Sequence, residues 1–169
     1  MNTSADRTGT TLDEYQLDRL IGRDGMGEVY EANDNRLGRT VALKILRPEF
    51  VENKERRARF DREATALATL NHPGIVTIYA LDTVDDTTFF TMELIDGKTL
   101  AEMIPDEGIM DTDRIPQLAI PVSDALAAAH KRRIAHRDMK PENIIGKPSG
   151  AISVLDFGLA KTVIQPIEQ

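Results

Sequence analysis

Short runs of alternating apolar and polar residues fill the first half of the chain from Tyr15 onward. Alternation with a period of two is typical of half-buried strands, and the Gly, Asn and Asp residues between the runs favour turns. The turn Asp85-Asp86 separates the last two runs. The pattern predicts five strands, at Leu17–Gly22, Gly27–Asn33, Thr40–Leu46, Ile75–Val84 and Thr88–Ile95.

The apolar period lengthens between the third and fourth predicted strands, where Phe60, Ala64 and Leu67 recur at helical spacing. This spacing predicts a helix over Val51–Leu70, which Asn71-His72-Pro73-Gly74 ends. Three strands, a helix and two strands predict an antiparallel five-stranded sheet with one packed helix, a fold of the α+β class.

The second half of the chain is predominantly helical in pattern, after a hinge at Ile95–Lys98. A short helix is predicted at Leu100–Ile104 and a longer one at Thr112–Lys131, and a short strand at Ile152–Leu155. Pro121 lacks a backbone donor and should start or kink the long helix. We therefore expect a flexible segment at 1–13, a unit rich in strands at 14–95 and a mainly helical unit at 96–169.

Composition excludes several classes of function. The 169 residues include 21 basic and 28 acidic side chains, a net charge of −7, which does not favour a nucleic-acid partner. There is no cysteine, so disulfides and thiolate chemistry are excluded. No apolar run approaches the ~20 residues that span a bilayer, and no secretory signal precedes Asp13. We expect a cytoplasmic protein with no membrane segment in this chain.

Three features of the strand-rich unit suggest a phosphate-binding site. Gly22, Gly25 and Gly27 lie between two predicted strands, where glycine lets backbone N–H groups approach a phosphate. Ala42 and Lys44 share one face of the next strand, which leaves room for a flat ring beside a cation. A plain turn and a solvent-facing lysine on an edge strand are the alternatives.

Glu63 is the third feature, because it lies on the apolar face of its helix between Phe60 and Leu67. A carboxylate there is costly unless it is paired, and Lys44 is the partner that we expect. The alternative is a glutamate at the margin of the helix that reaches outward into water.

The most specific signal is His136-Arg137-Asp138-Met139-Lys140-Pro141-Glu142-Asn143, followed by Asp156-Phe157-Gly158 after a predicted strand. The octapeptide supplies a carboxylate that can accept a hydroxyl proton and an amide oxygen that can bind a metal. The tripeptide supplies a second metal-binding carboxylate beside a glycine. The two motifs in this order indicate phosphoryl transfer.

These motifs, with Gly-Met-Gly-Glu-Val-Tyr and Asn-His-Pro, resemble those of the eukaryotic-like Ser/Thr protein kinases of bacteria, from about Tyr15 to Lys161. The resemblance implies that the units at 14–95 and 96–169 are a small lobe and a partial large lobe. It implies ATP-dependent transfer to Ser or Thr of a protein substrate, with Mg²⁺. It implies Asp138 as catalytic base, with Lys140 and Lys44 as its catalytic companions, and Asn143 and Asp156 as metal ligands. Met92 resembles the gatekeeper. The implied ATP-binding residues are Ile21, Gly22, Gly25, Gly27, Val29, Ala42, Lys44, Glu63, Met92, Glu93, Ile95, Asn143, Ile145 and Asp156, and the implied hydrophobic spine is Leu67, Ile78, His136 and Phe157.

Two residues depart from the family's pattern. Asp24 stands where the middle glycine of the loop is expected, and a carboxylate about 5 Å from a phosphate charge costs roughly 3 kcal/mol at an effective dielectric near 20. Gly25 beside it offers a way to swing Asp24 outward. Arg133 replaces a glycine, which costs on the order of 1 kcal/mol if the backbone there has a positive φ.

The sequence ends at Gln169, before the segments that hold the peptide substrate in the family. If the protein ends there, we expect negligible kinase activity from this chain alone, and a catalytically silent nucleotide- or partner-binding module is the alternative function. A decayed product that does not fold stably is a third interpretation. We also expect self-association through an exposed apolar strip on the long helix, formed by Leu118, Ala119, Val122, Leu126 and Ala129.

Overall fold

The computed structural model describes residues 6–51, 54–104 and 110–157. It divides into two compact units, residues 1–57 with 78–94 and residues 58–77 with 95–169. Residues 58–77, which follow the third long strand, are therefore counted with the second unit. The expected division of the chain at residues 13 and 95 stays a prediction.

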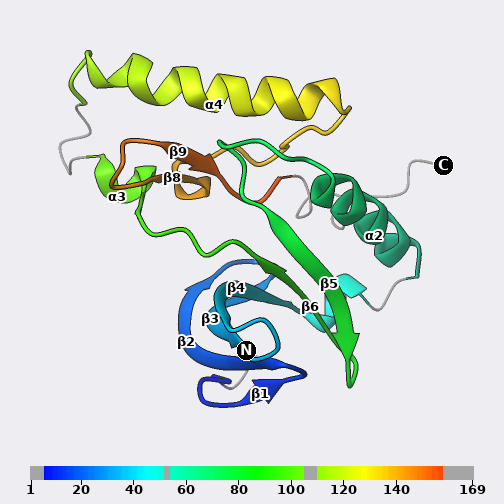
Figure 1. Cartoon of the computed structure of the whole chain (residues 1–169). Coiled ribbons are helices and arrows are strands. Elements are labelled where there is room, and N and C mark those ends of the chain that lie inside the picture. Colours follow the sequence, from blue (N-terminus) through cyan, green and yellow to red (C-terminus); the bar gives the residue numbers. More distant parts are fainter. Residues whose placement is uncertain (1–5, 52–53, 105–109, 158–169) are drawn as a thin grey trace. The chain divides into compact units, whose positions relative to one another are not determined.

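The first unit contains a six-stranded antiparallel sheet in the spatial order β1-β2-β3-β4-β6-β5 (Figure 1). All five predicted strands are present, and the sequence missed only the short β1. The strands are β1 (Thr11–Leu12), β2 (Tyr15–Arg23), β3 (Gly27–Asp34), β4 (Arg39–Leu46), β5 (Ile78–Val84) and β6 (Thr87–Met92).

The two faces of β4 have different partners, because successive side chains of a strand point to opposite faces. Val41, Leu43 and Ile45 belong to the apolar core of the first unit, whereas Ala42 and Lys44 face the other way. The core is completed by side chains from β2, β3 and β6, namely Tyr15, Leu17, Tyr30, Ala32 and Phe89. This core holds the sheet that positions Lys44.

Hydrogen bonds tie the residues before β2 to the sheet. The backbone N–H of Arg7 donates to the Tyr30 hydroxyl over 3.1 Å, and that of Gly9 donates to the Leu17 carbonyl over 2.7 Å. The segment that the sequence assigns to a flexible lead-in thus contributes β1 and two contacts to the sheet. At the other edge, Asp85 and Asp86 have φ of 46° and 62°, the left-handed pair that a two-residue hairpin turn requires.

The helix predicted at Val51–Leu70 is divided between α1 (Pro48–Val51) and α2 (Lys54–Ala68). Ala64 and Leu67 of α2 are buried, as their helical spacing predicts. The helix therefore has the apolar face that the sequence indicates, at least over its last turns.

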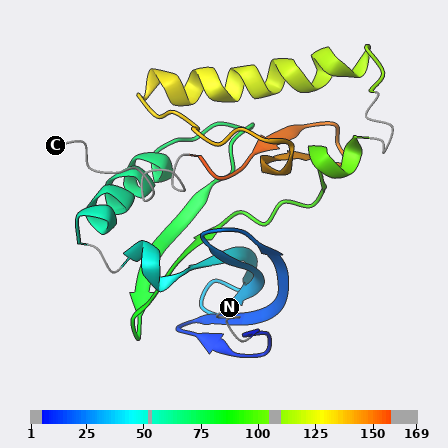
Figure 2. The same ribbon diagram turned by 180° about the vertical axis from the view of Figure 1, so that it is seen from behind.

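The second unit combines a three-stranded sheet, in the order β7-β8-β9, with helices. Helix α4 lies alongside β9, as both Figure 1 and Figure 2 show. The sequence missed the two-residue β7. The elements are β7 (Lys98–Thr99), α3 (Leu100–Met103), α4 (Arg114–Lys131), the 3₁₀ turn η1 (Pro141–Asn143), β8 (Ile144–Gly146) and β9 (Ile152–Val154).

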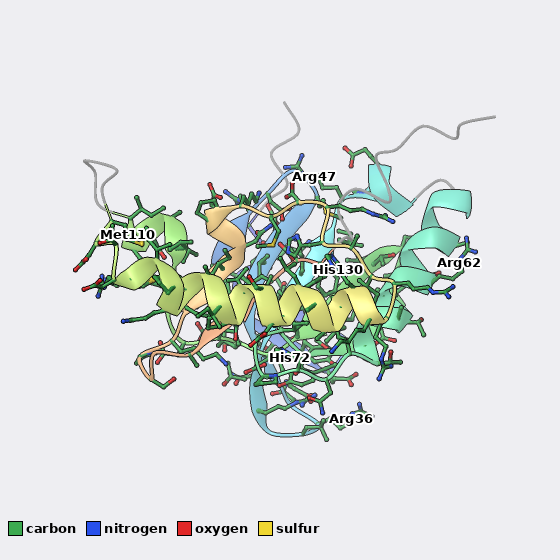
Figure 3. All side chains as sticks on the ribbon, turned by 90° about the horizontal axis from the view of Figure 1, so that it is seen from above. Arg36, Arg47, Arg62, His72, Met110 and His130 are labelled. Carbon is green, nitrogen blue, oxygen red and sulfur yellow. The ribbon has the colours of Figure 1, made fainter. Side chains whose placement is uncertain are left out.

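Pro121 was expected to start or kink the regular helix. It does not start the helix, because α4 begins at Arg114 and Pro121 lies inside it, and the kink stays a prediction. Pro116 lies in the first turn, where a backbone N–H has no helical partner to lose. Figure 3 labels Met110 just before α4 and His130 in its last turn. The helix is continuous from Arg114 to Lys131.

The apolar strip expected on α4 is also partly wrong. Ala129 is fully buried, together with Ala125, because this side of α4 packs within the second unit. The large exposed apolar side chains of α4 are Ile115 and Ile120, which are 50% and 61% exposed. Among the described helices, none is long and apolar enough to cross a membrane.

Candidate active site

The glycine-rich loop joins β2 to β3, and the close approach of two backbones fixes one of its glycines. A Cβ on Gly27 would lie 1.9 Å from the carbonyl oxygen of Ile45 in β4, so no side chain fits there. Nothing lies within 4 Å of a Cβ at Gly25. Gly27 is therefore required by packing, and Gly25 is not.

The strand register places the predicted ring-binding residues on one face of the sheet. Val29 of β3 lies opposite Lys44, and Ala42 lies opposite Met92 of β6. Residues that lie directly opposite each other in an antiparallel pair present their side chains on the same face. Ala42 and Met92 are buried, and Val29 is partly buried, so the small residue and the lysine share a face as the sequence predicts.

Lys44 is buried inside the sheet. Its side chain is only 2% exposed, and β4 lies between β3 and β6. The alternative of an edge-strand lysine in water is wrong. The ammonium Nζ of Lys44 lies 2.6 Å from the Oδ2 atom of Asp24, and the two form an ion pair.

The outward orientation of Asp24 that Gly25 offers is also wrong. The Asp24 side chain turns toward the sheet and is 32% exposed. Its Oδ1 atom accepts hydrogen bonds from the backbone N–H groups of Met26, at 2.8 Å, and Gly27, at 3.0 Å. Sequence reasoning named Asp24 as an obstacle to phosphate and missed its role as a partner of Lys44.

Burial by itself raises the pKa of Asp24, but the Lys44 charge and the hydrogen bonds from Lys44, Met26 and Gly27 outweigh it, so the pKa is lowered overall. Asp24 is therefore a carboxylate at neutral pH. Buried charges are costly unless paired and hydrogen-bonded, and this loop satisfies both conditions.

Other predicted ATP-binding residues are described by their place in the fold and their burial. Ile21 is 39% exposed at the end of β2, Gly22 lies opposite Val29, and Glu93, Ile95 and Ile145 are partly buried. Glu63 belongs to α2, but its side chain lies outside the described residues. The Lys44–Glu63 pair and the adenine contacts therefore stay predictions.

The catalytic-loop motif folds into a hydrogen-bonded turn within the second unit. Asn143, at the end of η1, is 5% exposed, and its Nδ2 atom donates to the backbone carbonyl of Asp138 over 2.9 Å. The Nζ atom of Lys140 lies 3.6 Å from Oδ2 of Asp138. The loop thus brings together the three residues that sequence reasoning assigned to base, companion lysine and metal ligand.

The segment before Asp156 is anchored to the same loop. The backbone N–H of Leu155 donates to the Asn143 carbonyl over 2.8 Å, and the Leu155 carbonyl lies 2.7 Å from Nε2 of His136. The rings of His136 and Phe157 pack with centroids 4.6 Å apart. The two motifs are therefore neighbours in space, whereas Gly158 lies outside the described residues.

His136 is neutral in this arrangement. Burial lowers its pKa, and the hydrogen bond with Leu155 and the charges of Asp156 and Asp138 oppose this only in part. Its Nδ1 atom accepts a hydrogen bond from the backbone N–H of Asp138 over 3.3 Å, so Nε2 carries the proton and donates to Leu155. A neutral imidazole thus links the base-bearing segment to the end of β9.

Left-handed backbone conformations mark this region. Arg133, Arg137 and Asp156 have φ of 62°, 63° and 52°. Such conformations of non-glycine residues cost on the order of 1 kcal/mol and cluster at functional sites, where the surrounding structure maintains them. The cost expected at Arg133 was conditional on a positive φ, and the structure meets that condition. The positive φ values at Arg137 and Asp156 were not anticipated from the sequence.

The residues present fit ATP and magnesium. The Asp24 carboxylate shows that Lys44 and two N–H groups of the glycine-rich loop converge on an anion, as they would on a phosphate oxygen. Because Nδ2 of Asn143 donates to the Asp138 carbonyl, its Oδ1 atom is the one that could bind a metal as a hard oxygen ligand, and the Asp156 carboxylate is of the same chemical type. Oxygen ligands of this kind suit Mg²⁺.

Comparison with known proteins identifies the family. The family model of the protein kinase domain matches residues 15–168. The chain belongs to the protein kinase family. A probable serine/threonine-protein kinase of Clostridium perfringens is 42% identical over 149 residues, which is 88% of this chain and 22% of that protein. The serine/threonine-protein kinase PknA of Mycobacterium tuberculosis is 40% identical over 163 residues, or 93% of this chain and 38% of that protein.

Solved kinase structures show the same fold. The PknI kinase domain of Mycobacterium tuberculosis matches with a TM-score of 0.80 and 30% identity, over 92% of this chain and 64% of that domain. A double mutant of that domain matches with a TM-score of 0.85 and 29% identity, over 96% of this chain and 66% of its own. The chain thus spans less than half of those curated kinases and about two thirds of the PknI kinase domain.

Proposed function

We propose that this kinase chain binds Mg-ATP and carries the groups that transfer the γ-phosphoryl group to a Ser or Thr hydroxyl of a protein, in the cytoplasm. The hydrogen-bonded turn from Asp138 to Asn143 carries the proposal, because it holds the base and a metal ligand in one loop. Ser/Thr kinase relatives at about 40% identity support the choice of acceptor.

Each residue has a role that its surroundings support. Asp138 accepts the proton of the attacking hydroxyl, and the ammonium of Lys140, 3.6 Å away, stabilises negative charge near it. Lys44 binds the α- and β-phosphates, and Asn143 and Asp156 hold magnesium, which neutralises phosphate charge when bound. Ile21, Val29, Ala42, Met92 and Ile145 supply apolar surface for adenine, with the Glu93–Ile95 backbone as its hydrogen-bonding partner.

Incubation with radiolabelled ATP, Mg²⁺ and a basic protein tests the proposal, followed by identification of the labelled amino acid. We expect little label from this chain alone. Any label should be on phosphoserine or phosphothreonine, and it should be lost with Asp138→Asn, which keeps the shape of the side chain but not its basicity. Label that persists in Asp138→Asn would contradict the role of Asp138. Mg-ATP binding without any label would instead support the silent nucleotide-binding module.

Self-association of this chain stays a prediction. Ile115 and Ile120 of α4 offer exposed apolar surface, and Leu118, Ala119 and Val122 line an apolar pocket with α3. Exposed apolar surface of this kind favours association. Sedimentation velocity over a range of concentrations should show a dimer that Ile120→Glu weakens, and a concentration-independent monomer would contradict it.

A further inference from the structure

The Asp24 carboxylate is held by three donors of the glycine-rich loop region. Two are backbone N–H groups, of Met26 and Gly27, and the third is the buried ammonium of Lys44 at 2.6 Å. All of them belong to the first unit. Oδ1 thus takes both backbone donors and Oδ2 takes the cation, so both carboxylate oxygens are engaged.

These donors match the chemistry of a phosphate site. Successive backbone N–H groups and a lysine ammonium are the groups that proteins use to hold phosphate oxygens. A nucleotide phosphate that reached Lys44 would meet a carboxylate already bound there. Because like charges repel at this distance, the Asp24 carboxylate disfavours a phosphate at the same ammonium and N–H groups.

We propose that Asp24 is an internal substitute for a nucleotide phosphate, which occupies the phosphate donors of the glycine-rich loop until ATP displaces it. The inference rests on the function proposed above and adds a regulatory element to the same site. It makes Asp24 a residue that opposes phosphate-bearing ligands selectively. Adenosine, which has no phosphate, does not compete with Asp24.

Displacement also changes the loop. When Asp24 leaves, the N–H groups of Met26 and Gly27 lose an acceptor and gain one only from the incoming phosphate. Gly25 allows the backbone of the loop to change conformation, because glycine is conformationally permissive. No atom lies within 4 Å of a Cβ built on Gly25, so the space around it is open. Loop closure over ATP and release of Asp24 are therefore one coupled step.

A purely structural role is the competing explanation. A side-chain oxygen that accepts from backbone N–H groups two and three residues ahead is a common way to stabilise a turn. In that case substitution of Asp24 would loosen the loop and change affinity for ATP and adenosine together. Substitution of Asp24 should therefore change the affinity for ATP alone if Asp24 substitutes for a phosphate, and the affinities for both ATP and adenosine if its role is structural.

The test is isothermal titration of Mg-ATP and of adenosine into the wild-type chain and into Asp24→Asn and Asp24→Gly. Asp24→Asn keeps the size of the side chain without its charge, and Asp24→Gly restores the residue expected in the loop. Asp18→Asn is the matched control, because Asp18 is an exposed carboxylate of β2 that accepts a hydrogen bond from Asn33. Thermal melting establishes that each variant is folded.

We expect both Asp24 variants to bind Mg-ATP ten- to a hundredfold more tightly, on the order of 1.4 to 3 kcal/mol, with adenosine affinity changed less than about twofold. Asp18→Asn should match the wild type for both ligands. Equal Mg-ATP affinities, or parallel changes for ATP and adenosine, would overturn the inference and leave Asp24 as a turn-stabilising residue. Absence of binding for both ligands in every variant would instead overturn the function proposed above, and this inference with it.

Discussion

The side-chain amide of Asn143 donates a hydrogen bond to the backbone carbonyl of Asp138 over 2.9 Å. This contact closes the catalytic loop on itself, and the backbone N–H of Leu155 in turn donates to the Asn143 carbonyl. Asn143 is therefore both a proposed metal ligand and the residue that holds the loop in shape.

Asn143→Asp separates these two roles, because it keeps oxygen ligands and removes the Nδ2 donor. We expect a loss of about 1–3 kcal/mol in the free energy of unfolding, since the part-buried carbonyl of Asp138 loses the hydrogen bond from Nδ2. Urea denaturation measures the change. Asn71→Asp, at an exposed position after α2, is the control and should change stability little. Equal stability of wild type and Asn143→Asp would show that the hydrogen bond contributes nothing.

Gly27→Ala should destabilise the first unit. The new Cβ would lie 1.9 Å from the Ile45 carbonyl oxygen, so β3 and β4 must move apart. Overpacking of this kind costs about 1–3 kcal/mol. Gly25→Ala is the matched control, because a Cβ there meets nothing within 4 Å. Gly27→Ala should have a lower melting temperature than Gly25→Ala, and the same melting temperature for both variants would refute the packing argument.

Arg133→Gly should stabilise the chain by on the order of 1 kcal/mol. Arg133 has φ of 62°, a conformation that glycine adopts without the Cβ penalty. Arg132→Gly provides the comparison, since Arg132 has φ of −94° and gains nothing from glycine. Chemical denaturation of both variants decides the matter. If Arg133→Gly were no more stable than the wild type, the claim that Arg133 strains the folded backbone would be contradicted.

Protonation of His136 should destabilise the fold. Burial lowers its pKa in the folded chain below the ordinary histidine value of 6.5, so the unfolded chain binds the proton more readily. The free energy of unfolding should therefore fall as the pH drops below about 6.5, until the folded-state pKa is passed. His136→Phe should remove this part of the pH dependence, whereas His130→Gln, at an exposed position of α4, should retain it. Parallel pH profiles for wild type and His136→Phe would exclude the effect.

The strands of the sheet could be predicted from sequence because their alternation of apolar and polar residues continues over six or more residues. Gly27–Asn33 and Thr40–Leu46 differ from β3 and β4 by one residue at one end. β1 and β7 were missed because two residues carry no recognisable period. Pro121 was expected to start or kink α4, yet the helix begins at Arg114 and continues past Pro121 to the buried Ala125 and Ala129.

Motif and spacing were enough to propose the candidate site residues, but they could not predict the contacts that these residues make. Local sequence shows that Asp24 brings charge into the loop. The direction in which the Asp24 side chain points depends on Lys44, which is twenty residues away in the chain, and on the backbone N–H groups of Met26 and Gly27. The left-handed conformations of Arg137 and Asp156 likewise depend on the fold around them, since neither residue type demands a positive φ.

Binding of Mg-ATP is the step on which phosphoryl transfer and release of Asp24 both depend, and its metal dependence can be measured directly. Isothermal titration of ATP with and without Mg²⁺, in wild type and in Asp156→Asn, is the measurement. We expect Mg²⁺ to tighten ATP binding in the wild type, and we expect most of that gain to be lost in Asp156→Asn, because the carboxylate proposed as a metal ligand becomes a neutral amide. No binding of ATP at millimolar concentration, or the same gain from Mg²⁺ in both proteins, would contradict the proposed binding of Mg-ATP by this chain.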